Sequence, residues 1–174
     1  LEFRRVLFRS DIEDDEIGIY APIFAEMGRS AAIHPDESVF ALLGNGFTTA
    51  CYDGQYFFDT DHPVYPKADG TGAAVSTANV VVDAEYTGEP WYVLDTKKAL
   101  KPFIFQERKK PELVSMTKTD DEAVFTSKQF RYGVDCRDAA GYGFWQMAFA
   151  NKRALTADNL WDCIQKMRDF TADG

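Results

Sequence analysis

Asp59, Thr60, Asp61 and His62 come closer than any other stretch of the sequence to a catalytic or metal-binding cluster. Two carboxylates and an imidazole within four positions could bind a divalent cation, as a metal-dependent hydrolase would require. Such a site needs further ligands, and His34 is the only other histidine. Loops rich in Asp and Pro are also common without metals. We therefore expect a structural loop here, with no metal or cofactor, and keep the hydrolase as the alternative.

The other candidate reactive groups favour structural roles. His34 precedes Pro35 at a predicted helix boundary, which indicates a capping or surface residue. Cys136 lies on the apolar face of a predicted strand, where a packed thiol is expected rather than a nucleophile. The three cysteines are odd in number and form no C-x-x-C pair, so we expect reduced thiols, with a structural disulfide as the alternative. No catalytic residue is assigned.

A dense group of charges follows the aromatic residues Phe103 to Phe105. This charge cluster consists of Glu107, Arg108, Lys109 and Lys110, and it is the candidate subunit interface. Pro111 is predicted to close it before a second strand begins at Leu113. Exposed ion pairs contribute only about 0–1 kcal/mol each, but complementary charges set the register and choice of partner. The alternative interpretation is a solvated hairpin end.

Hydrophobic periodicity predicts the elements around these residues. Residues 13–33 are expected to form a long helix with an acidic start and an apolar stripe, and Pro35 to interrupt it before a second helical stretch through 36–43. Residues 47–78 are expected to be irregular. Predicted strands occupy residues 80–82, 91–94, 102–106, 113–119, 130–136 and 144–150. A closing helix, capped by Thr156, has a stripe of Leu160, Ile164 and Met167. Mainly antiparallel strands with separate helices indicate the α+β class.

Composition limits the classes of function. An apolar content of 45%, including 14% aromatic residues, is ample for a packed core. The formal net charge is −9; without residues 1–10, which carry three arginines and one glutamate, 16 basic and 27 acidic residues give −11. This balance provides no overall footprint for nucleic-acid binding. No apolar run approaches the roughly 18–20 residues that a membrane helix needs.

The first ten residues have an unusual composition. Val6 to Ser10 can be encoded by GTG CTC TTC CGA TCT, which reads like the end of a common sequencing adapter. We therefore interpret residues 1–10 as a non-native segment and exclude them from the fold prediction. The alternative is a genuine basic, amphipathic N-terminus, and the source nucleotides would decide between the two.

Three long segments carry a resemblance to a known family: residues 19–32 (IYAPIFAEMGRSAA), 101–114 (KPFIFQERKKPELV) and 139–148 (AAGYGFWQMA). Residues 51–55, 57–58 and 62–66 support it. Across nearly all of residues 11–174, the sequence resembles the major head subunits of Mu-like phages and prophages. The resemblance implies the Hong-Kong-97-type capsid fold. It also implies a structural subunit, many copies of which assemble into the icosahedral head that holds phage DNA.

The resemblance also implies an arrangement and a set of partners. The 13–33 helix would be the spine helix, with an N-terminal arm and an extended loop expected before it and further chain expected after Gly174. Residues 11–174 are therefore interpreted as part of a subunit. The implied partners are copies of itself in hexamers and pentamers, scaffold and portal proteins, and packaged DNA bound without sequence specificity, with no membrane. Assembly would take place in the host cytoplasm and the product would be the virion capsid. A small head-completion or decoration protein is the other alternative.

Overall fold

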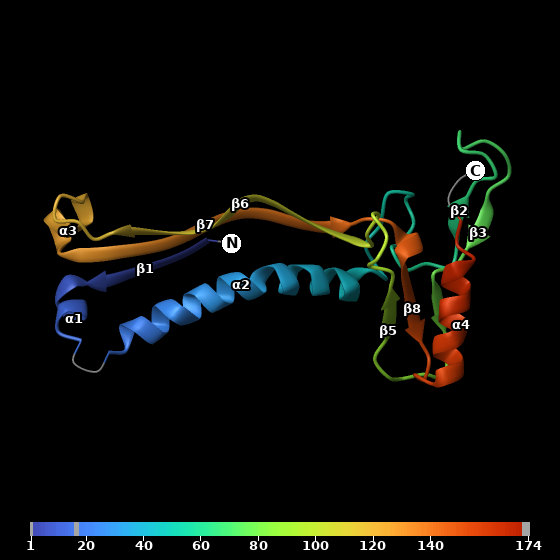
Figure 1. Cartoon of the computed structure of the whole chain (residues 1–174), viewed down its shortest axis with the longest axis horizontal. Coiled ribbons are helices and arrows are strands. Elements are labelled where there is room, and N and C mark those ends of the chain that lie inside the picture. Colours follow the sequence, from blue (N-terminus) through green and yellow to red (C-terminus); the bar gives the residue numbers. More distant parts are fainter. Residues whose placement is uncertain (1, 16–17, 172–174) are drawn as a thin grey trace. The chain divides into compact units, whose positions relative to one another are not determined.

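The computed structural model describes residues 2–15 and 18–171, and the chain divides into two compact units (Figure 1). The first unit comprises Leu1–Ser38 and Phe105–Ala140. The second unit comprises Val39–Ile104 and Gly141–Gly174. Each unit combines a helix with a three-stranded sheet, which confirms the predicted α+β class. No helix within residues 2–15 and 18–171 has the length and apolar character to cross a bilayer.

Two helices occupy the N-terminal part of the chain, α1 (Arg9–Glu13) and α2 (Tyr20–Asn45). The predicted helix over residues 13–33 begins too early, because α2 starts at Tyr20. Glu16, within the predicted acidic start, lies outside the described residues. The Asp15 carboxylate accepts hydrogen bonds from the backbone N–H groups of Gly18, Ile19 and Tyr20 at 2.9, 3.2 and 3.3 Å. It therefore caps the beginning of α2 and places a negative charge there, as the helix dipole favours.

The predicted interruption at Pro35 was wrong, because α2, which is 26 residues long, continues past this proline. Proline removes one backbone hydrogen bond and crowds the preceding turn, at a cost of about 3 kcal/mol in a helix interior. Tertiary contacts can offset this cost: the Phe24 ring packs against Tyr132 in a tilted arrangement with centroids 4.6 Å apart, and His34 bonds to Asp138. Packing against the sheet, rather than local propensity, therefore determines the length of α2.

The sheet of the first unit has the strand order β1-β7-β6. The strands are β1 (Glu2–Phe8), β6 (Phe103–Met116) and β7 (Gln129–Tyr142), and α3 (Glu122–Ser127) connects β6 to β7. Residues 2–8, which the sequence prediction left out of the fold, pair antiparallel with β7 from Glu2 opposite Asp135 to Phe8 opposite Gln129. In β7, the predicted alternation is confirmed: Val134 and Cys136 are buried, and the residues between and after them are exposed.

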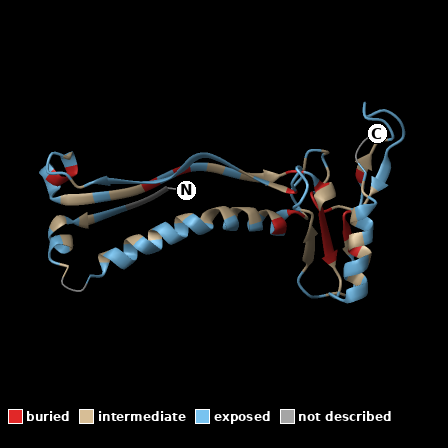
Figure 2. Cartoon of the chain, viewed as in Figure 1, coloured by how far each residue is buried: buried red, intermediate tan, exposed pale blue. Residues whose placement is uncertain are grey.

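Strand β6 runs without interruption through the charge cluster, so the predicted pair of strands with a charged connection was wrong. It lies at the edge of its sheet and hydrogen bonds only to β7. An edge strand has one side without ladder bonds, so Pro111 can be accommodated there without a missing donor. All residues from Gln106 to Met116 are exposed, as the blue stretch of β6 in Figure 2 shows.

The second unit is built around β8 (Ala148–Lys152), which lies between β4 (Val80–Val82) and β5 (Trp91–Leu94). Strand β8 is parallel to β4 and antiparallel to β5. Four of its five residues are buried, as a central strand requires. A small second sheet pairs β2 (His62–Val64) with β3 (Val75–Thr77).

The C-terminal elements of this unit follow the sequence prediction in part. Residues Trp145–Met147 form a 3₁₀ turn, so the buried strand begins at Ala148 rather than at residue 144. Helix α4 (Ala157–Arg168) starts as predicted, because the Thr156 hydroxyl accepts a hydrogen bond from the Asn159 N–H at 3.2 Å. Leu160 is 38% exposed, so the predicted stripe is wrong at this residue, and Cys163 is the buried residue of the helix. The hydrophobic core consists of Leu43, Phe57, Phe58, Val80, Trp145, Ala148 and Ala150.

Candidate functional site

The charge cluster is exposed on β6, but its four side chains have different surroundings. The Lys109 ammonium forms an ion pair with the Asp135 carboxylate on β7 at 2.7 Å, and this contact raises the pKa of Lys109. Glu107 and Lys110 both line a cavity against α2. No ion pair joins Arg108 to any residue that the structure describes. The assignment of the charge cluster to a subunit interface stays a prediction. Arg108 is the residue best suited to test it.

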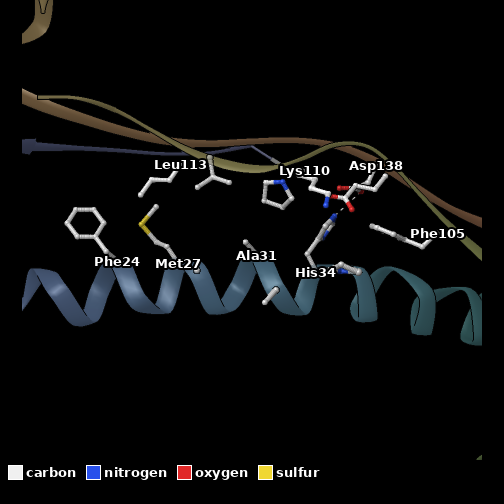
Figure 3. Close-up of a pocket in the computed structure, with 14 residues that line it drawn as sticks. Phe24, Met27, Ala31, His34, Phe105, Lys110, Leu113 and Asp138 are labelled. Carbon is white, nitrogen blue, oxygen red and sulfur yellow. Dashed lines mark hydrogen bonds and ion pairs between the residues drawn. The ribbon is translucent and has the colours of Figure 1, made fainter.

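The cavity of the first unit lies between α2 and the strands β6 and β7 and has a volume of about 490 Å³ (Figure 3). From the helix, Phe24, Met27 and Ala31 form an apolar wall. At one end, the wall becomes polar. The complete lining is Phe24, Met27, Gly28, Ala31, Ala32, His34, Pro35, Phe105, Glu107, Lys110, Pro111, Leu113, Val134 and Asp138.

His34 and Asp138 lie at the polar end of this cavity, and the buried Cys136 bonds to Asp138. The His34 Nε2 atom lies 3.0 Å from Asp138 Oδ1, and the Cys136 thiol donates to Asp138 Oδ2 at 3.2 Å. Hydrogen bonds from Cys136, and then from His34, lower the pKa of the Asp138 carboxyl. The prediction that His34 is a capping or surface residue was wrong, because α2 continues past it and turns it toward β7. Cys136 is buried, as predicted.

The donor atoms of Asp59, Asp61 and His62 do not all lie within 4.8 Å of one another, so the structure contradicts the alternative ligand set, that of a hydrolase. The Asp59 carboxylate accepts hydrogen bonds from the backbone N–H groups of Tyr56 and Thr60 at 3.2 and 2.7 Å. Asp61 is exposed, and its contact with the Asp59 carboxyl raises its pKa. The His62 ring is fully buried and stacks on Trp145, with centroids 4.2 Å apart and planes 10° apart.

His62 instead belongs to a buried network with Asp53 and Asn79. Its Nδ1 atom lies 2.6 Å from Asp53 Oδ2, and its Nε2 atom lies 3.2 Å from Asn79 Oδ1. The Asn79 amide orientation is fixed, because its Nδ2 group donates to the Phe57 carbonyl at 2.7 Å. Both ring nitrogens therefore lie within hydrogen-bond distance of side-chain oxygens, which fixes the orientation of the ring.

The thiol of Cys51 completes this second group. Its Sγ atom donates to Asp53 Oδ1 at 2.9 Å. Burial, and then this hydrogen bond, raise the pKa of Cys51 to about 12. The thiol is therefore protonated at neutral pH and is a poor nucleophile. A His62–Asp53–Cys51 group of this kind stabilises the loop rather than performing chemistry.

Sequence reasoning missed Asp53, Asn79 and Asp138. One available signal was the repeated Cys-x-Asp pattern, at residues 51–53 and 136–138. In each case the carboxylate bonds to the thiol two positions earlier and to a distant histidine. In strand β7, residues two apart share a face, so this spacing places the Cys136 thiol and the Asp138 carboxylate together. In residues 51–54 a turn brings the same two groups together. The histidine partner cannot be read from the spacing.

The Asp53 carboxyl makes the stability of the second unit depend on pH. Burial would raise its pKa, but hydrogen bonds from Cys51 and His62 outweigh burial and lower it below the value of 3.8. Its stabilising contribution is therefore complete above that value and is lost as the pH falls through the lower, folded-state pKa. Urea unfolding can be followed by tryptophan fluorescence at about pH 6 and about pH 3. Between these two pH values, the free energy of unfolding should fall less for Asp53→Asn than for the unmodified chain. Equal losses would contradict this assignment.

Comparison with known proteins agrees with this arrangement. The sequence profile of the family described as Mu-like prophage major head subunit gpT matches residues 4–174. The major capsid protein of Escherichia phage Mu is 60% identical over 166 residues, which are 95% of this chain and 54% of that protein. The Mu-like prophage FluMu major head subunit of Haemophilus influenzae is 52% identical over 168 residues, with the same coverage. The chain thus spans about half the length of these relatives.

Solved structures of phage heads match the fold. A chain from the procapsid of bacteriophage JBD30 superposes with a TM-score of 0.83 at 50% identity, covering 100% of this chain and 59% of that chain. A chain from the bacteriophage JBD30 capsid gives the same TM-score at 28% identity and covers 57% of that chain. The expected capsid fold of the Hong-Kong-97 type is thereby confirmed. On the match over residues 4–174 and the identity to both relatives, the chain belongs to the family of Mu-like prophage major head subunits, gpT.

Proposed function

We propose that this chain is part of a subunit that assembles with copies of itself into the icosahedral shell of a phage head. The observation that carries the proposal is the exposure of strand β6. Ile104, Leu113 and Val114 are 52%, 56% and 56% exposed, although they are large and apolar. A strand that leaves such side chains in water is suited to contact with another subunit, which would remove this surface from solvent.

The charge cluster would provide specificity at this contact. Charged residues on an edge strand discourage indiscriminate strand pairing, and Pro111 acts in the same direction. Complementary charges on a neighbouring copy would fix the register of the contact rather than supply most of its affinity. Because Lys109 already pairs with Asp135 within the chain, Arg108 is the side chain best placed to reach a neighbour.

The remaining partners follow from this role. The copies would form hexamers and pentamers, assembled in the host cytoplasm with scaffold and portal proteins, and would end in the virion capsid. The net charge of −9 supports an inner surface that does not adhere to packaged DNA. A head-completion or decoration protein gains no support from the described geometry. The role is structural, and no step of it requires catalysis.

The charge of Arg108 provides the test. In the full-length subunit, Arg108→Glu should abolish or strongly reduce the yield of shells seen by electron microscopy, because it reverses a charge at the contact. Circular dichroism of the purified subunit should be unchanged, since no ion pair with a described residue is lost.

Arg108→Lys keeps the charge and is the matched control, which should form normal shells. Normal shells from Arg108→Glu would remove the charge cluster from the interface. If the unmodified full-length subunit formed no shells at all, the proposed function itself would fail.

A further inference from the structure

We propose that His34, Cys136 and Asp138 form a binding site for a zinc-class divalent cation in the first unit. One nitrogen, one sulfur and one carboxylate oxygen from these residues lie within 4.8 Å of one another. Imidazole, thiolate and carboxylate are the donors that Zn²⁺ takes in proteins, and the thiol disfavours Mg²⁺ and Ca²⁺. The site is independent of the proposed shell assembly.

The spacing of the donor atoms is close to a tetrahedral site. With ordinary zinc bond lengths, nitrogen and oxygen ligands lie about 3.4 Å apart, and sulfur and oxygen ligands about 3.6 Å apart. The corresponding contacts here use both oxygens of one carboxylate: His34 Nε2 lies 3.0 Å from Asp138 Oδ1, and Cys136 Sγ lies 3.2 Å from Asp138 Oδ2. To admit the ion, the Asp138 carboxylate would turn one oxygen toward it and the side chains would shift outward. Loss of the thiol proton would accompany binding.

The fourth ligand position has room, because His34 and Asp138 line the cavity of about 490 Å³ (Figure 3). A water molecule from that cavity could complete the tetrahedron, the arrangement seen in zinc sites with three protein ligands. Glu107 and Lys110 are the other charged groups that line the cavity. A bound ion would connect α2 to β7 through one ligand from the helix and two from the strand.

The chemically equivalent group of Cys51, Asp53 and His62 is a poorer site and provides an internal comparison. Its two contacts, 2.6 and 2.9 Å, are both shorter and would have to open further. Both nitrogens of His62 are already bonded, and the ring is clamped against Trp145 with no exposed surface. His34 bonds through Nε2 to a carboxylate that would itself become a ligand.

Calorimetric titration of the metal-free chain with Zn²⁺, under reducing conditions, tests the proposal. We expect one ion per chain with a dissociation constant of about 1 μM or lower. Cys136→Ser and His34→Gln should each weaken binding by about tenfold or more. Cys51→Ser, the same chemical change in the equivalent group, should leave the affinity unaltered.

Co²⁺ provides a readout that a structural hydrogen-bond network would not give. Thiolate-coordinated Co²⁺ should produce a charge-transfer absorption that disappears in Cys136→Ser and persists in Cys51→Ser. Circular dichroism of each variant verifies folding, and His34→Gln allows the same conclusion if Cys136→Ser fails to fold. The proposal is overturned if the chain binds no Zn²⁺, if neither Cys136→Ser nor His34→Gln weakens binding, or if Cys51→Ser removes it.

Discussion

Replacing Asn79 by alanine should lower the free energy of unfolding of the second unit by about 3–5 kcal/mol. Asn79 is fully buried. Its Oδ1 atom accepts from the Asp59 N–H at 2.9 Å and from His62 Nε2 at 3.2 Å, and its Nδ2 group donates to the Phe57 carbonyl at 2.7 Å. Alanine would leave all three groups without partners inside the unit. A buried polar group without a partner costs about 1–3 kcal/mol.

Urea unfolding followed by tryptophan fluorescence measures this effect, because all three tryptophans belong to the second unit. Asn151→Ala is the matched control: Asn151 is equally buried, but its Nδ2 group has no hydrogen-bond partner among the described residues. The same side-chain atoms are removed, and Asn151→Ala also removes the hydrogen bond that Asn151 Oδ1 accepts from Arg153 Nε at 3.0 Å. The difference between the two variants therefore measures how much more the hydrogen bonds of Asn79 contribute to stability. Equal destabilisation by Asn79→Ala and Asn151→Ala would contradict the role assigned to the network.

Several elements could be predicted from the sequence because local patterns determine them. The alternation in β7 and the capping hydroxyl of Thr156 depend on neighbours within a few positions. Helix α2 and strand β6 were divided wrongly at Pro35 and Pro111, because both prolines are strong local signals. Tertiary packing keeps Pro35 within α2, and the edge position of β6 accommodates Pro111.

The polar groups were harder to predict, since their partners lie far apart along the chain. His62 bonds to residues 9 and 17 positions away, and His34 bonds to a residue 104 positions away. The pattern Asp59-Thr60-Asp61-His62 suggested proximity, but the buried, stacked imidazole bonds to Asp53 and Asn79 instead. The family resemblance predicted the fold, whereas no local spacing predicted which histidine meets which carboxylate.

Gly143→Ala should destabilise the second unit by about 3 kcal/mol, because its added methyl group would overlap the main chain rather than a mobile side chain. The Gly143 N–H donates to the Pro102 carbonyl at 2.8 Å, and the next N–H, of Phe144, donates to the Lys101 carbonyl at 3.1 Å. A β-carbon at residue 143 would overlap the carbonyl oxygen of Lys101. Relief would require these two segments to separate and lose both hydrogen bonds.

Gly141→Ala is the matched control, because a β-carbon at residue 141 meets no atom within 4 Å. Both glycines belong to the same short segment, and the loss of backbone freedom in the unfolded chain is the same for each replacement. The difference between the two unfolding midpoints in urea therefore measures the overlap alone. If Gly143→Ala unfolded at the same urea concentration as Gly141→Ala, the close approach of residue 143 to Lys101 would be absent in solution. A large loss confined to Gly143→Ala would establish that contact as one of those that join the two chain segments of the second unit, beside the pairing of β8 with β4 and β5.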